Sequence, residues 1–134
     1  MPSLDQFATR MKQRALEIER GAGKLVRETA LVANQAVIAA TPVDTGRARA
    51  NWLASLQNPV EEATDNVDPS GSETIAANAS TIENQKPGES IYLSNNLPYI
   101  ESLNQGSSAQ APAGFVEQAV QTAVAYVRKK RLLR

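Results

Sequence analysis

The sequence of 134 residues contains no cysteine and no histidine, and aromatic residues make up only 4% of it. Without cysteine, disulfide bonds and thiolate metal sites are excluded. Without histidine, the commonest general base and the commonest transition-metal ligand are absent, which argues against zinc or iron chemistry and against Ser-His or Cys-His catalysis. We therefore expect no catalytic residues, no metal site and no cofactor.

Long hydrophobic runs are also missing. No segment approaches the roughly 20 apolar residues that a membrane span needs. Near the N-terminus, Asp5 and Arg10 interrupt the apolar stretch that a signal peptide would require. We expect a protein that is made in the cytoplasm and has no membrane partner.

Basic and acidic residues balance, at 14 each, but they are unevenly distributed. The segment 58–90 holds one basic residue, Lys86, and seven acidic ones: Glu61, Glu62, Asp65, Asp68, Glu73, Glu83 and Glu89. Such asymmetry favours self-assembly or a polar partner over broad nucleic-acid binding.

The strongest pattern in the chain predicts a long helix over residues 3–40, within a single domain of residues 1–134. Apolar residues recur there at steps of three and four, and Ser3 with Gln6 forms a capping-box pattern at the start. Thr41-Pro42 ends the helix, because the residue before a proline is disfavoured in the helical region. A helix of about 55 Å overhangs a small domain, so a second subunit is the natural partner for the overhanging part.

The rest of the chain is divided into shorter elements by clusters of turn residues. We predict a strand over 47–57, a mobile acidic loop over 58–72, a short helix over 73–84 with Ser72 as its N-cap, a strand over 90–95, a helical turn from Tyr99 to Asn104, and a C-terminal helix over 113–130 with Pro112 at its head.

The tripeptide Asp44-Thr45-Gly46 has two interpretations. An aspartic protease would need a second carboxylate from another copy and an apolar strand leading into the aspartate, whereas a helix precedes it here. The favoured interpretation is a turn, in which Pro42 sets the entry, Asp44 accepts hydrogen bonds from backbone N–H groups and Gly46 supplies the unusual dihedral angle. On this basis Asp44→Ala would cost about 1 kcal/mol.

Two groups of basic residues are candidate binding sites. Arg47 and Arg49 fall on one face of the predicted strand, where they could clamp a phosphate or a carboxylate, although a solvated or internally paired face is favoured. The C-terminal stretch RKKRLLR, residues 128–134, could bind nucleic acid or an acidic membrane surface. The favoured interpretation is that these cations stabilise the negative end of a helix.

Two segments resemble a known family. Residues 41–52, TPVDTGRARANW, are similar to the Pro-Val-Asp-Thr-Gly-Arg-x-Arg-x-x-Trp signature of tailed-bacteriophage neck and tail-completion proteins, the minor tail component or head-tail joining group. Residues 87–120 resemble the family's later segment, in which a strand leads into Asn-Asn-x-Pro-Tyr, a short helix and Gly-x-Ser-x-Gln-Ala-Pro-Ala-Gly before the last helix. With the helices around them, the resemblance covers nearly the whole chain.

The resemblance implies an α+β fold, in which a long N-terminal helix and a C-terminal helix pack on a small antiparallel sheet. It implies a non-enzymatic virion protein, assembled in the host cytoplasm, that forms a ring around the DNA channel, commonly of six copies. The ring joins the head connector or adaptor to the tail terminator or tube proteins. Pro42, Asp44, Gly46 and Trp52 would then build a corner, with Trp52 anchored against the long helix. Candidate interface residues are Arg47, Arg49, Tyr99, Gln110, Pro112 and Phe115.

The alternative function is a small regulatory or nucleic-acid-binding module that uses the basic C-terminus. A dimeric aspartic protease is the third and least favoured class.

Overall fold

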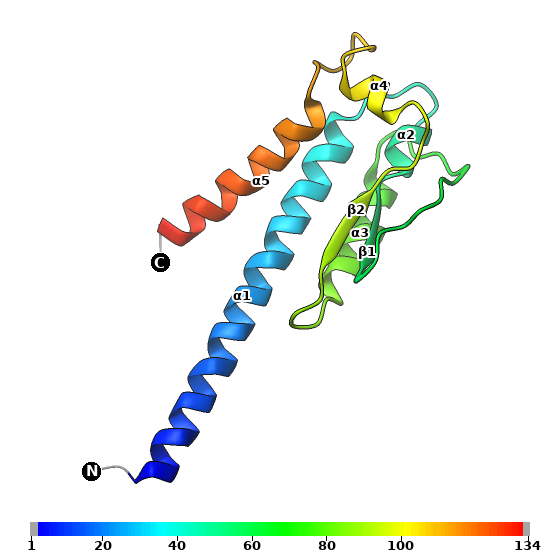
Figure 1. Ribbon diagram of the computed structural model, residues 1–134. Coiled ribbons are helices and arrows are strands. Elements are labelled where there is room, and N and C mark those ends of the chain that lie inside the picture. The colour runs from blue at the N-terminus through cyan, green and yellow to red at the C-terminus, as the bar shows by residue number, and fades with distance from the viewer. Residues whose placement is uncertain (1–2, 133–134) are drawn as a thin grey trace.

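A computed structural model describes residues 3–132 of the chain (Figure 1). The elements in order are α1 Leu4–Ala40, α2 Arg47–Ala50, β1 Leu53–Leu56, α3 Ser72–Glu83, β2 Ile91–Ser94, α4 Ile100–Asn104 and α5 Phe115–Leu132. This confirms the predicted α+β class, with a long N-terminal helix, a C-terminal helix, a two-stranded antiparallel sheet and a short helix before the second strand.

The first helix, α1, begins and ends as its terminal residues require. The Ser3 hydroxyl accepts a hydrogen bond from the Gln6 amide at 3.2 Å, and the Gln6 side chain accepts one from the Ser3 amide at 3.0 Å, which together form a capping box. Thr41 has an extended backbone (φ −70°, ψ 127°), as expected before Pro42. Between these ends the helix continues without interruption.

The other elements surround only the C-terminal half of α1 (Figure 1). Helix α5 runs along one side of it, while α3 and the sheet lie on the other. Lys130 of α5 donates to the Glu28 carboxylate of α1 at 2.6 Å, which raises the pKa of Lys130. The N-terminal half of α1 projects beyond these elements, and residues 3–20 are all exposed.

The core lies where α1, β1 and α5 meet. Trp52 packs there with Val37 and Ile38 of α1 and Ala119 of α5. The single tryptophan is 7% exposed. Alanine contributes five of the buried hydrophobic residues between 3 and 132, so the core is built largely from small side chains.

A buried amide pair connects α1 to α3 and the sheet. The Asn78 side chain donates to the Asn34 side chain at 2.9 Å and to the Trp52 carbonyl at 2.7 Å. Its oxygen accepts from the Ala54 amide at 3.1 Å. The strands β1 and β2 pair from Leu53↔Ser94 to Leu56↔Ile91. Helix α3 is thereby fixed to the edge of β1 by a side chain, where a third strand would otherwise pair.

The predicted strand over 47–57 is wrong in its first half, because Arg47–Ala50 forms the short helix α2 and the strand begins at Leu53. The Gly46 carbonyl accepts from the Ala50 amide at 3.1 Å, which closes the helical turn. Arginine and alanine are both good helix formers. Once Gly46 sets the chain direction, the alternation of arginine and alanine over 47–50 is therefore compatible with a helical turn.

Two helix starts also differ from prediction. Helix α3 has Gly71, not Ser72, at its N-cap, and the carboxylate of Asp68 supplies the capping oxygens. Helix α5 begins at Phe115 rather than at 113. The side-chain oxygen of Asn104 accepts from the Val116 amide at 2.9 Å, so a residue of α4 caps α5 and Pro112 lies before the helix.

Candidate interaction site at the 41–52 corner

The corner between α1 and β1 is built around Gly46. Its φ of +93° lies in the left-handed region, which favours glycine. A Cβ atom at this position would lie 2.4 Å from the Pro69 nitrogen and 2.7 Å from the Asp68 carbonyl carbon. The Gly46 carbonyl also accepts from the Asp68 amide at 3.0 Å. The segment around Asp68 is therefore in direct backbone contact with the corner.

Arg49 ties three parts of the corner together through backbone carbonyls. Its guanidinium donates to Thr41 at 2.9 Å and Ala39 at 3.0 Å, at the end of α1, and to Pro69 at 3.0 Å and Ser70 at 3.3 Å. The planar fork of arginine suits several donors in fixed directions, and its charge stabilises the carbonyl end of a helix. Arg49 thus has an internal structural role.

Trp52 is joined to α1 by a hydrogen bond as well as by packing. Its indole Nε1 donates to the Thr41 hydroxyl at 2.9 Å, and that hydroxyl donates to the Val37 carbonyl at 2.6 Å. Neighbouring Asn51, which is 1% exposed, exchanges two hydrogen bonds with the backbone of Thr64. These contacts fix β1 to α1 on one side and the acidic loop to the corner on the other.

Asp68, not Asp44, is the carboxylate that organises this region. Burial raises the pKa of Asp68, but hydrogen bonds from the Thr74 amide and hydroxyl, the Gly71 amide and the Ser70 hydroxyl outweigh it and hold the pKa below its ordinary value. The loop predicted to be mobile is thus attached to the corner at Thr64 and Asp68.

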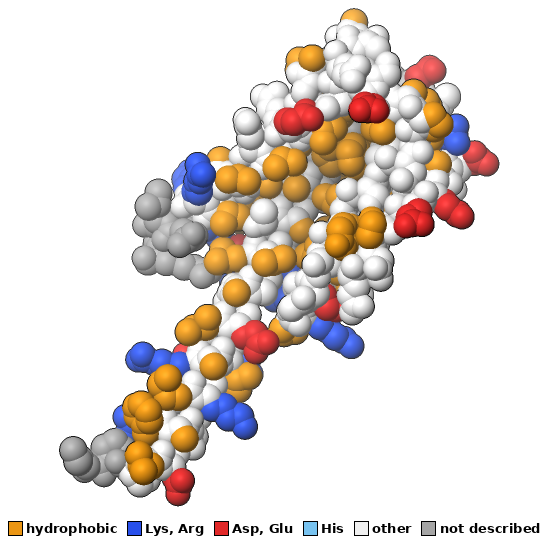
Figure 2. Space-filling view, viewed as in Figure 1, with side chains coloured by type: hydrophobic (Ala, Val, Ile, Leu, Met, Phe, Trp, Pro, Cys, Tyr) orange, Lys and Arg blue, Asp and Glu red, His pale blue; other side chains and the backbone are white. Residues whose placement is uncertain are grey.

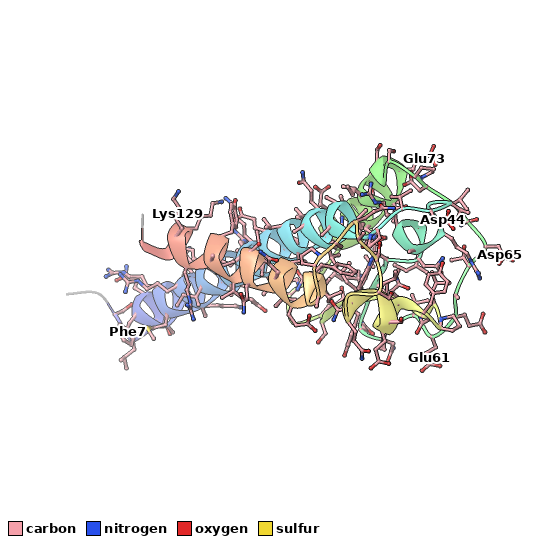
Figure 3. All side chains as sticks on the ribbon, turned by 90° about the horizontal axis from the view of Figure 1, so that it is seen from above. Phe7, Asp44, Glu61, Asp65, Glu73 and Lys129 are labelled. Atoms are coloured by element: carbon pink, nitrogen blue, oxygen red, sulfur yellow. The ribbon has the colours of Figure 1, made fainter. Side chains whose placement is uncertain are left out.

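The turn prediction is wrong about the hydrogen bonds of Asp44. Within residues 3–132 it makes no hydrogen bond, and the hydroxyl of Thr45 accepts from the Arg47 amide instead, at 3.3 Å. Figure 3 shows Asp44 at the end of the molecule opposite Phe7, on the same side as Asp65. Its side chain is exposed, and it lies in a loop between two helices, which is not the strand-held setting that a catalytic aspartate requires.

The second segment that bears the family resemblance, residues 87–120, contacts this corner. The Gln110 side chain donates to the Val43 carbonyl at 2.8 Å and accepts from the Val43 amide at 2.9 Å. This paired exchange holds the 106–114 loop against the turn. A hollow of about 480 Å³ lies between the two segments, with Tyr99 and Leu103 of the second segment facing residues 42–48 of the first.

The structure divides the candidate interface residues into three groups. Phe115 is 2% exposed and belongs to the core, so its assignment to an interface is wrong. Arg49 and Gln110 are engaged in the internal hydrogen bonds described above. Pro112 is exposed, Tyr99 is 41% exposed, and Arg47 pairs at 3.2 Å with the fully exposed Asp65. These last three residues are accessible to a partner.

The basic C-terminal stretch is only partly free to bind. Arg128 and Lys129 are exposed, whereas Lys130 pairs with Glu28 and lies 5.6 Å from the centre of the Tyr126 ring. The predicted contribution of Arg134 falls outside the described residues.

Two features are absent between residues 3 and 132. No helix there has both the length and the apolar character needed to cross a membrane. No group of three or more acidic, histidine or cysteine residues in that range is arranged to hold a metal ion.

Comparisons of the chain with family models, with curated proteins and with solved structures gave no match.

Proposed function

We propose that this chain is a structural subunit of a tailed-bacteriophage neck, a tail-completion protein of the head-tail junction. Copies form a closed ring, commonly of six, around the DNA channel. One surface of the ring meets the head connector or adaptor, and the other meets the tail terminator or tube. The role is geometric, and no reaction is catalysed.

The observation that carries the proposal is the meeting of the two segments that bear the family resemblance. Val43 lies in the first segment and Gln110 in the second, 67 residues apart, and they exchange two hydrogen bonds. Short motifs that occur by chance have no reason to meet in space. Motifs that have to build one joint of a fold do, and Gly46, Trp52 and Gln110 all contribute to this joint.

The exposed half of α1 gives further support. Seventeen residues of α1, 4–20, are all exposed in the single chain. A subunit of a ring can leave such an element bare because the next subunit covers it, and a heterologous interface that closes on itself generates a ring.

The test is to find where the protein lies and what its loss does. In the phage that encodes it, immunogold labelling should mark the head–tail junction of intact particles. Removing the gene should leave DNA-filled heads and finished tails unjoined, and adding purified protein to that lysate should restore joined particles. Joined particles in the absence of the protein would refute the proposal.

A further inference from the structure

The N-terminal half of α1 presents a continuous apolar stripe to solvent. Leu4, Phe7, Met11 and Ile18 recur on one face of the helix and are 87, 57, 54 and 70% exposed. We call residues 4–20 the overhang. Figure 2 shows its hydrophobic side chains in a row that leads toward the body of the molecule. Contiguous apolar patches above roughly a few hundred Å² mark interaction surfaces in soluble proteins.

The same face of α1 continues into an apolar groove on the body. Leu25, Val26, Thr29 and Ala33 form its floor, α5 forms one wall and β2 the other, around a space of about 450 Å³. On the α5 wall, Val120 and Val124 are 53 and 41% exposed, and Ile91 and Leu93 face the groove from β2. Within residues 3–132, each chain therefore carries this apolar stripe and this apolar groove with no element of its own chain covering either.

We infer that the overhang of one subunit docks in this groove of a second copy of the chain. The inference rests on the self-assembly that the proposed function requires, and it names the surfaces involved. An overhang cannot reach its own groove, because α1 is one uninterrupted helix and its N-terminal half runs away from the body (Figure 1). One stripe and one groove per chain are fully used when every subunit donates to the next around a closed assembly, of which a reciprocal pair is the smallest case.

The length and the apolar character of the overhang both fit this groove. From Phe7 to Ile18 the stripe spans about 16 Å, and the groove floor from Leu25 to Ala33 spans about 12 Å. An amphipathic helix with anchors at steps of three and four is a standard ligand for such a groove. Apart from Thr29, the residues that line the groove are all apolar, as are the four exposed side chains of the stripe.

Engineered disulfides test the inference directly, because introduced cysteines are the only thiols in this chain. Met11→Cys in the overhang and Val124→Cys in the groove both replace exposed residues, so the fold should tolerate them. Mixing the two single variants under mild oxidation should give a disulfide-linked pair. The double variant should give a ladder of linked species, as a head-to-tail chain requires.

Thr9→Cys is the matched control, since Thr9 lies on the opposite side of the overhang and bonds only to the Asp5 carbonyl of its own helix. Mixed with Val124→Cys, it should not crosslink above background. In parallel, Met11→Asp should reduce the mass measured by light scattering, and Thr9→Asp should leave it unchanged. The light-scattering comparison tests the docking independently of the disulfide geometry.

Three results would overturn the inference. In the first, Met11→Cys crosslinks to itself in preference to Val124→Cys, so that overhangs pair with one another. In the second, the oligomer persists in Met11→Asp without the mixed crosslink, so that the ring uses another surface. In the third, the chain stays monomeric and uncrosslinked at every concentration. None of these results contradicts the proposed location at the neck of the particle, which immunogold labelling tests separately.

Discussion

Replacing Gly46 by alanine tests whether the corner is as tightly built as the structure shows. Two costs follow from the geometry. The first is the backbone term, since an alanine at φ +93° costs about 1–2 kcal/mol. The second is steric, because the new methyl carbon would lie 2.4 Å from the Pro69 nitrogen. That atom belongs to the backbone, so the segment at 68–69 has to move, at the roughly 1–3 kcal/mol typical of overpacking.

Gly88→Ala is the control that separates these two costs. Gly88 has a similar φ of +84°, but a Cβ there would meet nothing within 4 Å. It should therefore bear the backbone cost alone, about 1–2 kcal/mol. Gly46→Ala should lower the free energy of unfolding by about 2–5 kcal/mol in total, so it should exceed the control by about 1–3 kcal/mol.

Urea unfolding followed by fluorescence measures the difference, and Trp52 is the only tryptophan and is buried. With a slope of about 1–3 kcal/mol per molar urea, the midpoints of the two variants should differ by on the order of 1 M. If both variants unfold at the same urea concentration, the contact between Gly46 and the Asp68–Pro69 backbone is absent in solution. The proposed joint would then have to be rejected.

Three further substitutions probe the polar contacts by the same urea assay. Asp68→Asn should destabilise the protein at neutral pH. Because the folded state lowers the pKa of Asp68, the carboxylate's contribution to stability is present above the unfolded pKa and is lost as pH falls through the folded pKa. The difference in unfolding free energy between wild type and variant should therefore close in acid. A gap that stays constant with pH would exclude this role. Asp44→Ala should change stability by less than about 0.5 kcal/mol, and a larger loss would restore the original turn assignment. Asn78→Ala should cost about 1–3 kcal/mol, because it leaves the side-chain oxygen of buried Asn34 without its donor. Ser80→Ala, at an exposed position of the same helix, should cost little. Equal effects would contradict the role given to the Asn34–Asn78 pair.

Features that depend on neighbours in the sequence were predictable. The helix over 3–40 was placed to within a residue, because its apolar period runs for many turns and its ends carry local signals in Ser3 and Pro42. The second strand was placed equally well, between two clusters of turn residues. The need for a glycine at position 46 also followed from the turn pattern.

Features that depend on distant contacts were not predictable. The pattern of Asp44-Thr45-Gly46 pointed to the nearest carboxylate, whereas the carboxylate that caps and closes the region is Asp68, which reaches it only through the folded loop. The alternation of Arg47 and Arg49 suggested a strand, because nothing in the sequence shows that Arg49 binds carbonyls from two separate segments. The pair of Asn34 and Asn78 had no local signal at all.

The energetics of the overhang bear on how a ring of this chain would form. Full burial of Leu4, Phe7, Met11 and Ile18 contributes about 1.5–3 kcal/mol for each side chain. Association of two free molecules costs an estimated 4–15 kcal/mol in lost freedom of motion, so one docked overhang is close to balance. The last contact in a ring is different, because both partners are already held in place and their effective concentration is high. Open chains should therefore be sparse and closed rings favoured, which makes assembly steeply dependent on concentration or on a template that gathers the subunits.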